Sequence, residues 1–119
     1  MMVDDVFSLL ENSNKLNASA MSLTRCLILA LLSYFLDGIQ YRELKVALKI
    51  SDGKLIANLN KLKDMQYVKK FETEINHNKI DIYTLSPKGR NELNKVIEWM
   101  ELVQRVAKED KECQRILTK

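Results

Sequence analysis

The order of elements between Tyr41 and Arg90 constrains the fold of this chain most strongly. Residues 41–48 have the apolar spacing of a short helix, Lys49-Ile50 forms a turn, and Ser51-Asp52-Gly53 opens a second helix that runs to about residue 65. Two alternating strands follow, at 67–73 and 79–85, with a tip at 74–78, and a further helix starts at Ser86 and Pro87. This order predicts two helices across a tight turn followed by a β-hairpin.

The flanking segments predict helices that complete one domain over residues 1–119. Residues 3–12 form a short amphipathic helix, a second helix runs from Ser19 or Ser22 to Leu36, and a long terminal helix spans 86–117. For the second helix we expect an inner face of Leu23, Leu27, Ala30, Leu31 and Tyr34, and closure by Asp37-Gly38. Ile39-Gln40 is a candidate minimal strand at the edge of the hairpin sheet.

Composition favours a mainly helical α+β fold in a reducing compartment. The chain is 46% hydrophobic and has only three Gly and one Pro, which favours long helices. Cys26 lies in an apolar run and Cys113 in a charged tail, and their spacing matches no metal motif. The acidic start and the short apolar run at 26–36 predict neither an export signal nor a membrane span. We therefore expect a cytoplasmic protein without metal or cofactor.

Positive charge is concentrated on the predicted pair of helices. Residues 41–70 hold eight basic and three acidic side chains, whereas residues 1–40 are net acidic and residues 71–119 are balanced. Solubility alone commonly explains lysine on surface helices. Here the excess falls on the segment that would contact phosphates if the partner were duplex DNA.

Three motifs in this order resemble the winged helix-turn-helix transcriptional regulators of the MarR/ArsR superfamily, and most closely the small winged helix DNA-binding domain proteins. The motifs are Arg25-Cys26-Leu27-Ile28-Leu29, the pattern from Tyr41 to Val68, and Tyr83-Thr84-Leu85-Ser86-Pro87-Lys88-Gly89-Arg90. They cover about residues 22–105. The resemblance implies a helix-turn-helix core and wing over residues 19–90. It also implies a dimer of terminal helices at 3–12 and 86–117 that binds double-stranded DNA to regulate transcription.

The residues expected to bind DNA fall into three groups. Phosphate contacts are expected from Arg42, Lys45, Lys61, Lys69, Lys70 and Lys79. Base reading is expected from the start of the 52–65 helix, with Ser51, Asp52, Gly53, Lys54, Ala57 and Asn58 in or beside the major groove. The third group is the wing tip, where His77 is a solvated residue or a phosphate contact. The tip has few cations, and relatives usually carry His at position 58 and Ser at position 56.

Apolar residues at the two ends predict the dimer interface. The candidates are Val6, Phe7, Leu10, Leu93, Ile97, Met100, Leu102 and Val103. Alternatively, the N-terminal segment covers the long helix within one subunit.

Two other functional classes are alternatives to DNA binding. A winged helix can serve as a protein-interaction module without binding DNA, which the weakly basic wing and the net charge of +3 favour. An enzyme has little support, because the sequence has one His, no Gly-rich phosphate loop and no nucleophile–base pair. A small-molecule effector at the dimer seam is compatible with the resemblance, but no residue set identifies it.

Overall fold

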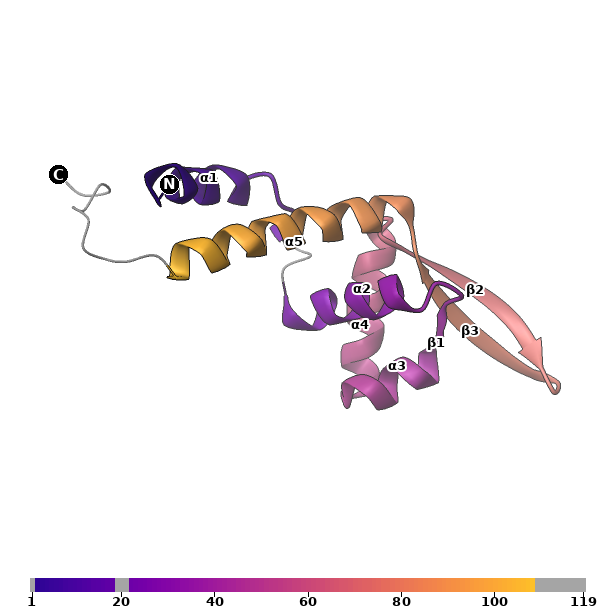
Figure 1. Ribbon diagram of the computed structural model, residues 1–119. Helices are drawn as coiled ribbons and strands as arrows, with labels where there is room; N and C mark the ends of the chain where they lie inside the picture. The colour runs from indigo at the N-terminus through magenta and orange to yellow at the C-terminus, as the bar shows by residue number, and fades with distance from the viewer. Residues whose placement is uncertain (1, 19–21, 109–119) are drawn as a thin grey trace.

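The computed structural model describes residues 2–18 and 22–108 (Figure 1). The predicted α+β architecture is confirmed. In chain order the elements are α1 (Met2–Ser13), α2 (Leu23–Tyr34), β1 (Ile39–Gln40), α3 (Tyr41–Leu48), α4 (Asp52–Asp64), β2 (Val68–Ile75), β3 (Asn78–Leu85) and α5 (Pro87–Lys108). The body of α2, α3 and α4 lies beside a long arm formed by α1 and α5, and the β2–β3 hairpin projects from the body (Figure 1).

Serine residues define the starts of three helices. The hydroxyl groups of Ser22, Ser51 and Ser86 each accept a hydrogen bond from the backbone N–H three residues later, at 2.9–3.2 Å. Such a cap satisfies one of the N–H groups that the first turn leaves without a partner, and is worth about 1 kcal/mol. The predicted caps at Ser51 and Ser86 are therefore confirmed, and Ser22 is the correct choice for the second helix.

The sheet is antiparallel with β3 in its centre, in the order β1-β3-β2. Ile39 of β1 lies opposite Tyr83, and the hairpin register pairs Val68 with Leu85. The hairpin turn is only two residues long, because β2 and β3 extend further toward the tip than the predicted 74–78 loop allows. Asn76 and His77 both have positive φ, 53° and 67°, as a type I′ turn requires.

The core lies where α2, α3 and α4 meet the base of the sheet, and it corrects the predicted orientation of α2. Ile28, Leu29 and Leu32 are the buried residues of this helix. The predicted inner residues Leu23 and Tyr34 are instead 76% and 78% exposed. The helix is apolar on most of its surface, so periodicity gave no preferred face.

The end of α2 also differs from the prediction. The helix stops at Tyr34 rather than Leu36, with the Phe35 N–H bonded to the Leu31 carbonyl at 3.0 Å. Gly38 has a φ of 102° and lies in the turn before β1 rather than at the helix end. Its backbone lies close against the side chains of β3, so it both takes the left-handed conformation and leaves room for the sheet.

The hairpin extends beyond the core, so β2 is not the half-buried strand that its alternation predicted. Val68 is its one buried residue, and every later residue of β2 is exposed. Phe71 and Ile75 share the face turned away from Val68, and they are 52% and 44% exposed. The outer part of the wing therefore exposes apolar side chains as well as charges.

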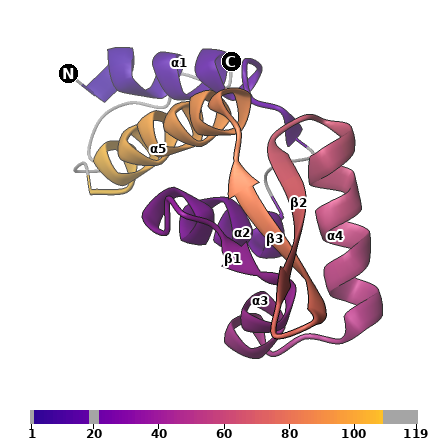
Figure 2. The same ribbon diagram turned by 90° about the vertical axis from the view of Figure 1, so that its right-hand side faces the viewer.

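The long helix α5 carries α1 along its C-terminal half (Figures 1 and 2). The Trp99 indole N–H donates to the Leu9 carbonyl at 3.2 Å, and Arg105 lies 3.5 Å from the Asp5 carboxylate. The N-terminal helix thus covers the long helix within one subunit, as the alternative prediction held. The described part of α5 ends at Lys108, and the remainder of the predicted 86–117 helix lies outside the described residues.

A buried carboxylate links the arm to the body. Glu92 of α5 is 5% exposed. Its Oε2 accepts from the Asn17 backbone N–H at 2.8 Å, and its Oε1 accepts from the Tyr67 hydroxyl at 3.3 Å. The Asn17 side-chain amide also donates to the Tyr67 hydroxyl at 2.9 Å. A charge in this position needs such donors, because burial removes it from water.

Replacing Tyr67 with Phe is expected to destabilise the fold by about 1–3 kcal/mol, because the buried Glu92 carboxylate loses a donor. The shift of the chemical-denaturation midpoint at constant slope measures the effect. Tyr34→Phe is the matched control, since its exposed hydroxyl predicts a change within about 0.5 kcal/mol. Equal midpoints for the two variants would contradict a stabilising role for this network.

Candidate nucleic-acid interface

The outward face of α4 is small and basic, as the sequence predicted. Gly53, Lys54, Ala57 and Lys61 are all exposed, while the inner stripe of Leu55, Leu59 and Leu62 is buried at 1% exposure or less. The helix lies along one side of the body with β2 next to it (Figure 2). Nothing lies within 4 Å of the position that a Cβ on Gly53 would occupy, so the start of the helix is open to a large ligand.

The structure places Asn58 in an internal network rather than free on this face. The Asn58 side chain is half-buried, and its Oδ1 accepts from Arg25 Nε at 3.0 Å. Its Nδ2 donates to the Lys54 carbonyl at 2.8 Å. An asparagine that pairs with adenine uses the same two atoms. The predicted role of Asn58 as a base reader would therefore have to use the second lone pair of Oδ1 and the second N–H of Nδ2, or break the existing bonds.

Arg25 is a residue of this surface that the site prediction missed. It lies in the first turn of α2, and its guanidinium reaches across to Asn58 of α4. Local sequence patterns gave no link between two residues 33 positions apart. One signal was present, because Arg25 is the only basic residue between positions 16 and 41, in an otherwise apolar helix.

Asp52, the first residue of α4, is held by two side chains of α3. The Tyr41 hydroxyl donates to Asp52 Oδ1 at 2.7 Å, and Lys45 Nζ lies 3.0 Å from Oδ2. These bonds, the one from Tyr41 foremost, lower the pKa of the Asp52 carboxyl, so it is ionised at neutral pH. Desolvation, followed by the hydrogen bond to Asp52, raises the pKa of Tyr41 to about 12, so its hydroxyl remains a donor.

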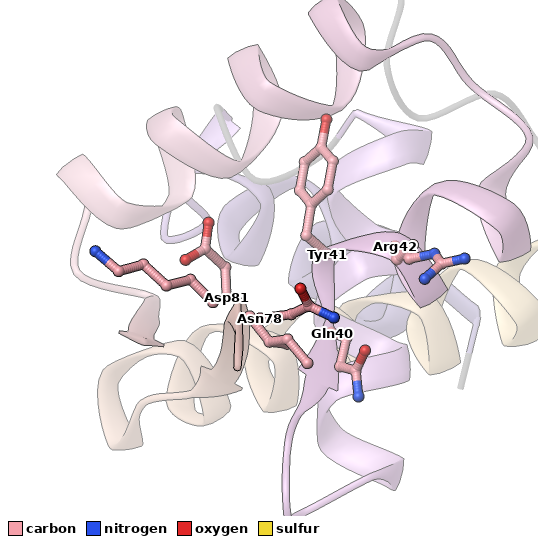
Figure 3. A pocket seen from close by; sticks show the side chains of 7 residues that line it. Gln40, Tyr41, Arg42, Asn78 and Asp81 are labelled. Carbon is pink, nitrogen blue, oxygen red and sulfur yellow. The ribbon is translucent and has the colours of Figure 1, made fainter. Parts of the chain in front are cut away.

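A groove of about 330 Å³ separates the start of α3 from the wing (Figure 3). Gln40, Tyr41 and Arg42 line one side, and Asn78, Lys79, Ile80 and Asp81 of β3 line the other. Arg42 and Lys79 are exposed. The groove therefore has a cation on each side, which suits a phosphate of a nucleic-acid backbone.

The remaining predicted cations divide between the two faces of the hairpin. Lys70 shares the inner face with Tyr83 and pairs with Asp81 at 3.6 Å. Lys69 is opposite Thr84, so it projects from the reverse face. Adjacent residues in a strand point to opposite sides, so Lys69 and Lys70 project from opposite faces of the wing. His77 is exposed in the two-residue turn at the tip.

The part of the chain that the structure describes has no metal cluster and no membrane-spanning helix. No group of three or more His, Cys, Asp or Glu side chains gathers there into a possible metal site. No helix in residues 2–18 and 22–108 combines the length and apolar character needed to cross a bilayer. Burial raises the pKa of the Cys26 thiol, which disfavours a reactive thiolate and fits a small side chain in an apolar helix. Cys113 lies outside the described residues.

Comparison with protein families identifies this arrangement of helices and hairpin. Residues 24–103 match the family described as winged helix DNA-binding domain. The chain belongs to this family. The match begins in α2 and ends in α5, so this winged helix domain comprises the helical body, the wing and most of the arm helix. Comparison with curated proteins and with solved structures gives no match.

Proposed function

We propose that this winged helix protein is a sequence-specific transcriptional regulator, similar to the MarR/ArsR group, that binds double-stranded DNA as a homodimer. The observation that carries the proposal is the exposed face of α4, where Gly53, Lys54, Ala57 and Lys61 lie together without cover from other described parts of the chain. The major groove of B-DNA is about 12 Å wide and admits a helix. Small residues at positions 53 and 57 let the α4 backbone approach the base edges closely.

Backbone contacts would then form on both sides of α4. Lys54 and Lys61 supply positive charge along one flank, and Arg25 adds a cation bound to Asn58. The groove between α3 and the wing, with Arg42 and Lys79, supplies it on the other. Contacts of this kind fix the position of a protein on the duplex without reading its sequence.

The homodimer part of the proposal rests on apolar side chains that the arm leaves exposed. Phe7 and Leu10 of α1 are 50% and 47% exposed, and Ile97 and Met100 of α5 are 47% and 53% exposed. Val6 and Val103 are partly exposed and extend this surface. Leu93 and Leu102, which the sequence also suggested, are each 7% exposed and already packed within the subunit. They support the proposed interface from inside.

Replacing Ile97 and Met100 together with Glu is expected to convert a dimer to a monomer, because like charges would meet across an apolar interface. Sedimentation velocity at micromolar concentration measures the change, and Ile97→Val with Met100→Leu is the matched control. A wild-type monomer, or a dimer that persists in the glutamate variant, would place self-association elsewhere or exclude it.

Selection of bound duplexes from a random library tests the proposed function. The expected result is a palindromic motif whose half-sites are about one helical turn apart, roughly 10 bp centre to centre, since the two α4 helices of a twofold dimer would enter successive major grooves. An unpaired half-site would contradict dimeric binding. Failure to enrich any duplex would overturn the proposal.

The alternative, a protein-interaction module that does not bind DNA, is favoured by one observation. Leu23, Tyr34 and Leu36 are 76%, 78% and 74% exposed on and after α2. Large exposed apolar groups of this kind often mark a partner surface. This alternative predicts no duplex binding at any salt concentration, so the same selection experiment separates the two functions.

A further inference from the structure

A carboxylate occupies the start of α4, on a surface that is otherwise small or basic. Asp52 opens the helix, and its neighbours Gly53, Lys54 and Ala57 have no negative charge. An acidic group facing DNA opposes attraction to phosphates. An acidic residue is favoured there by the positive end of the helix dipole, and at the end of α4 proposed to enter the groove it would also face the bases.

The position of this carboxylate is fixed before any ligand arrives. One oxygen accepts from the Tyr41 hydroxyl at 2.7 Å and the other accepts from Lys45 Nζ at 3.0 Å. Both donors come from α3, so the contact also ties the two helices together. A side chain that is already ordered loses less conformational entropy on binding. Each oxygen of a carboxylate has two lone pairs, so each retains an acceptor site.

The donors and acceptors on the base edges indicate which base the Asp52 carboxylate can bind. A carboxylate only accepts hydrogen bonds, so the O6 of guanine and the O4 of thymine would repel it. Adenine offers its N6 amino group, but the N7 acceptor lies next to it. Cytosine itself presents only the N4 amino donor in the major groove, with no acceptor on its own edge, and it is the base that Asp and Glu recognise.

We propose that Asp52 is a specificity-determining residue that accepts a hydrogen bond from the N4 amino group of a cytosine. Tyr41 and Lys45 are its positioning residues. The inference rests on the proposed DNA-binding function and adds one base preference to it. In the free protein, Lys45 is paired with Asp52, so its ammonium group is not available for a DNA phosphate. The sequence suggested Lys45 as a phosphate contact. Here its role is instead to hold the Asp52 carboxylate in position.

Parallel selections from one random duplex library, with wild type and Asp52→Asn, test the proposal. The wild type is expected to enrich a motif with cytosine at one position of each half-site. In Asp52→Asn, discrimination at this position alone is expected to fall about tenfold, because the neutral amide can both donate and accept. Asp64→Asn is the matched control, since it removes the same charge from the exposed far end of α4 and should leave the motif unchanged.

A second readout separates base recognition from a purely structural role. Asp52→Asn releases Lys45, so the slope of log affinity against log salt on non-specific duplex should steepen by about 0.9. Tyr41→Phe keeps the ring and the charge of Asp52 but removes the hydroxyl. It is expected to retain the cytosine consensus with severalfold weaker discrimination.

The outcomes distinguish this inference from the proposed function. If the wild type enriches no duplex, the proposed function fails and the inference fails with it. If the wild type enriches a motif that Asp52→Asn reproduces at every position, with both variants folded by circular dichroism, only the inference is overturned. The same holds if Asp64→Asn changes the motif as much as Asp52→Asn does.

Discussion

Replacing Lys54 and Lys61 together with Ala is expected to weaken binding to every duplex by about 10- to 100-fold at fixed salt, because two charged contacts to phosphate are lost. The slope of log affinity against log salt should fall in magnitude by about 1.8, since each phosphate neutralised contributes about 0.9. Fluorescence anisotropy with a labelled duplex, titrated at several salt concentrations, measures both quantities. Both lysines are exposed, so the fold should remain intact.

The control for this variant has the same change in net charge on the arm. Lys15 and Lys108 are exposed; Lys15 follows α1 and Lys108 ends α5, so neither is part of the outward face of α4. Lys15→Ala with Lys108→Ala should alter the salt slope little. If the control reduces affinity as much as the α4 variant, binding follows net charge and the α4 face has no special role. Unchanged affinity in the α4 variant would likewise exclude this surface.

Replacing Gly89 with Ala is expected to destabilise the protein by about 1–3 kcal/mol, a large part of the stability of an ordinary domain. Gly89 is buried in the first turn of α5, and an added Cβ would overlap the Tyr67 carbonyl oxygen. This oxygen also accepts from the Ser86 N–H at 3.0 Å, so it has little freedom to move. The Leu85 side chain would lie 2.8 Å from the new carbon. Thermal and denaturant unfolding measure the loss.

The same substitution at Gly53 provides the matched control. A Cβ there meets nothing within 4 Å, and the residue lies in the first turn of α4. Gly53→Ala is expected to stabilise the fold by about 0.4–1 kcal/mol, mainly because alanine restricts the unfolded chain. Opposite signs for the two variants are the expected result. A Gly89→Ala protein as stable as wild type would contradict the close packing of α5 against the start of β2.

The sequence predicted the elements well where local chemistry determines them. Ser51 and Ser86 satisfy N–H groups within their own helices, so a few neighbouring residues contain all the required information. The face of α2 was mistaken because Leu23, Leu27 and Tyr34 are as apolar as the residues that are buried. Periodicity distinguishes an inner face only when the outer face is polar.

Contacts between segments distant in sequence could not be predicted from the residue pattern. The small and basic character of α4 is local, and it was correctly read. The Arg25–Asn58 hydrogen bond and the hold of Tyr41 on Asp52 depend on how α2 and α3 pack against α4. The wing was likewise misjudged, because alternation in β2 was taken to mean a buried face where the hairpin instead extends past the core.

A titration of the ¹⁵N-labelled protein with a short duplex, followed by amide chemical shifts, tests whether the start of α4 and the wing tip contact DNA. The largest shifts are expected on residues 51–57 at the start of α4 and on residues 76–79 at the wing tip. The outer face of α2, including Leu23 and Tyr34, should change little. Shifts concentrated on α2 or on the arm, with residues 51–57 unaffected at saturation, would contradict this contact.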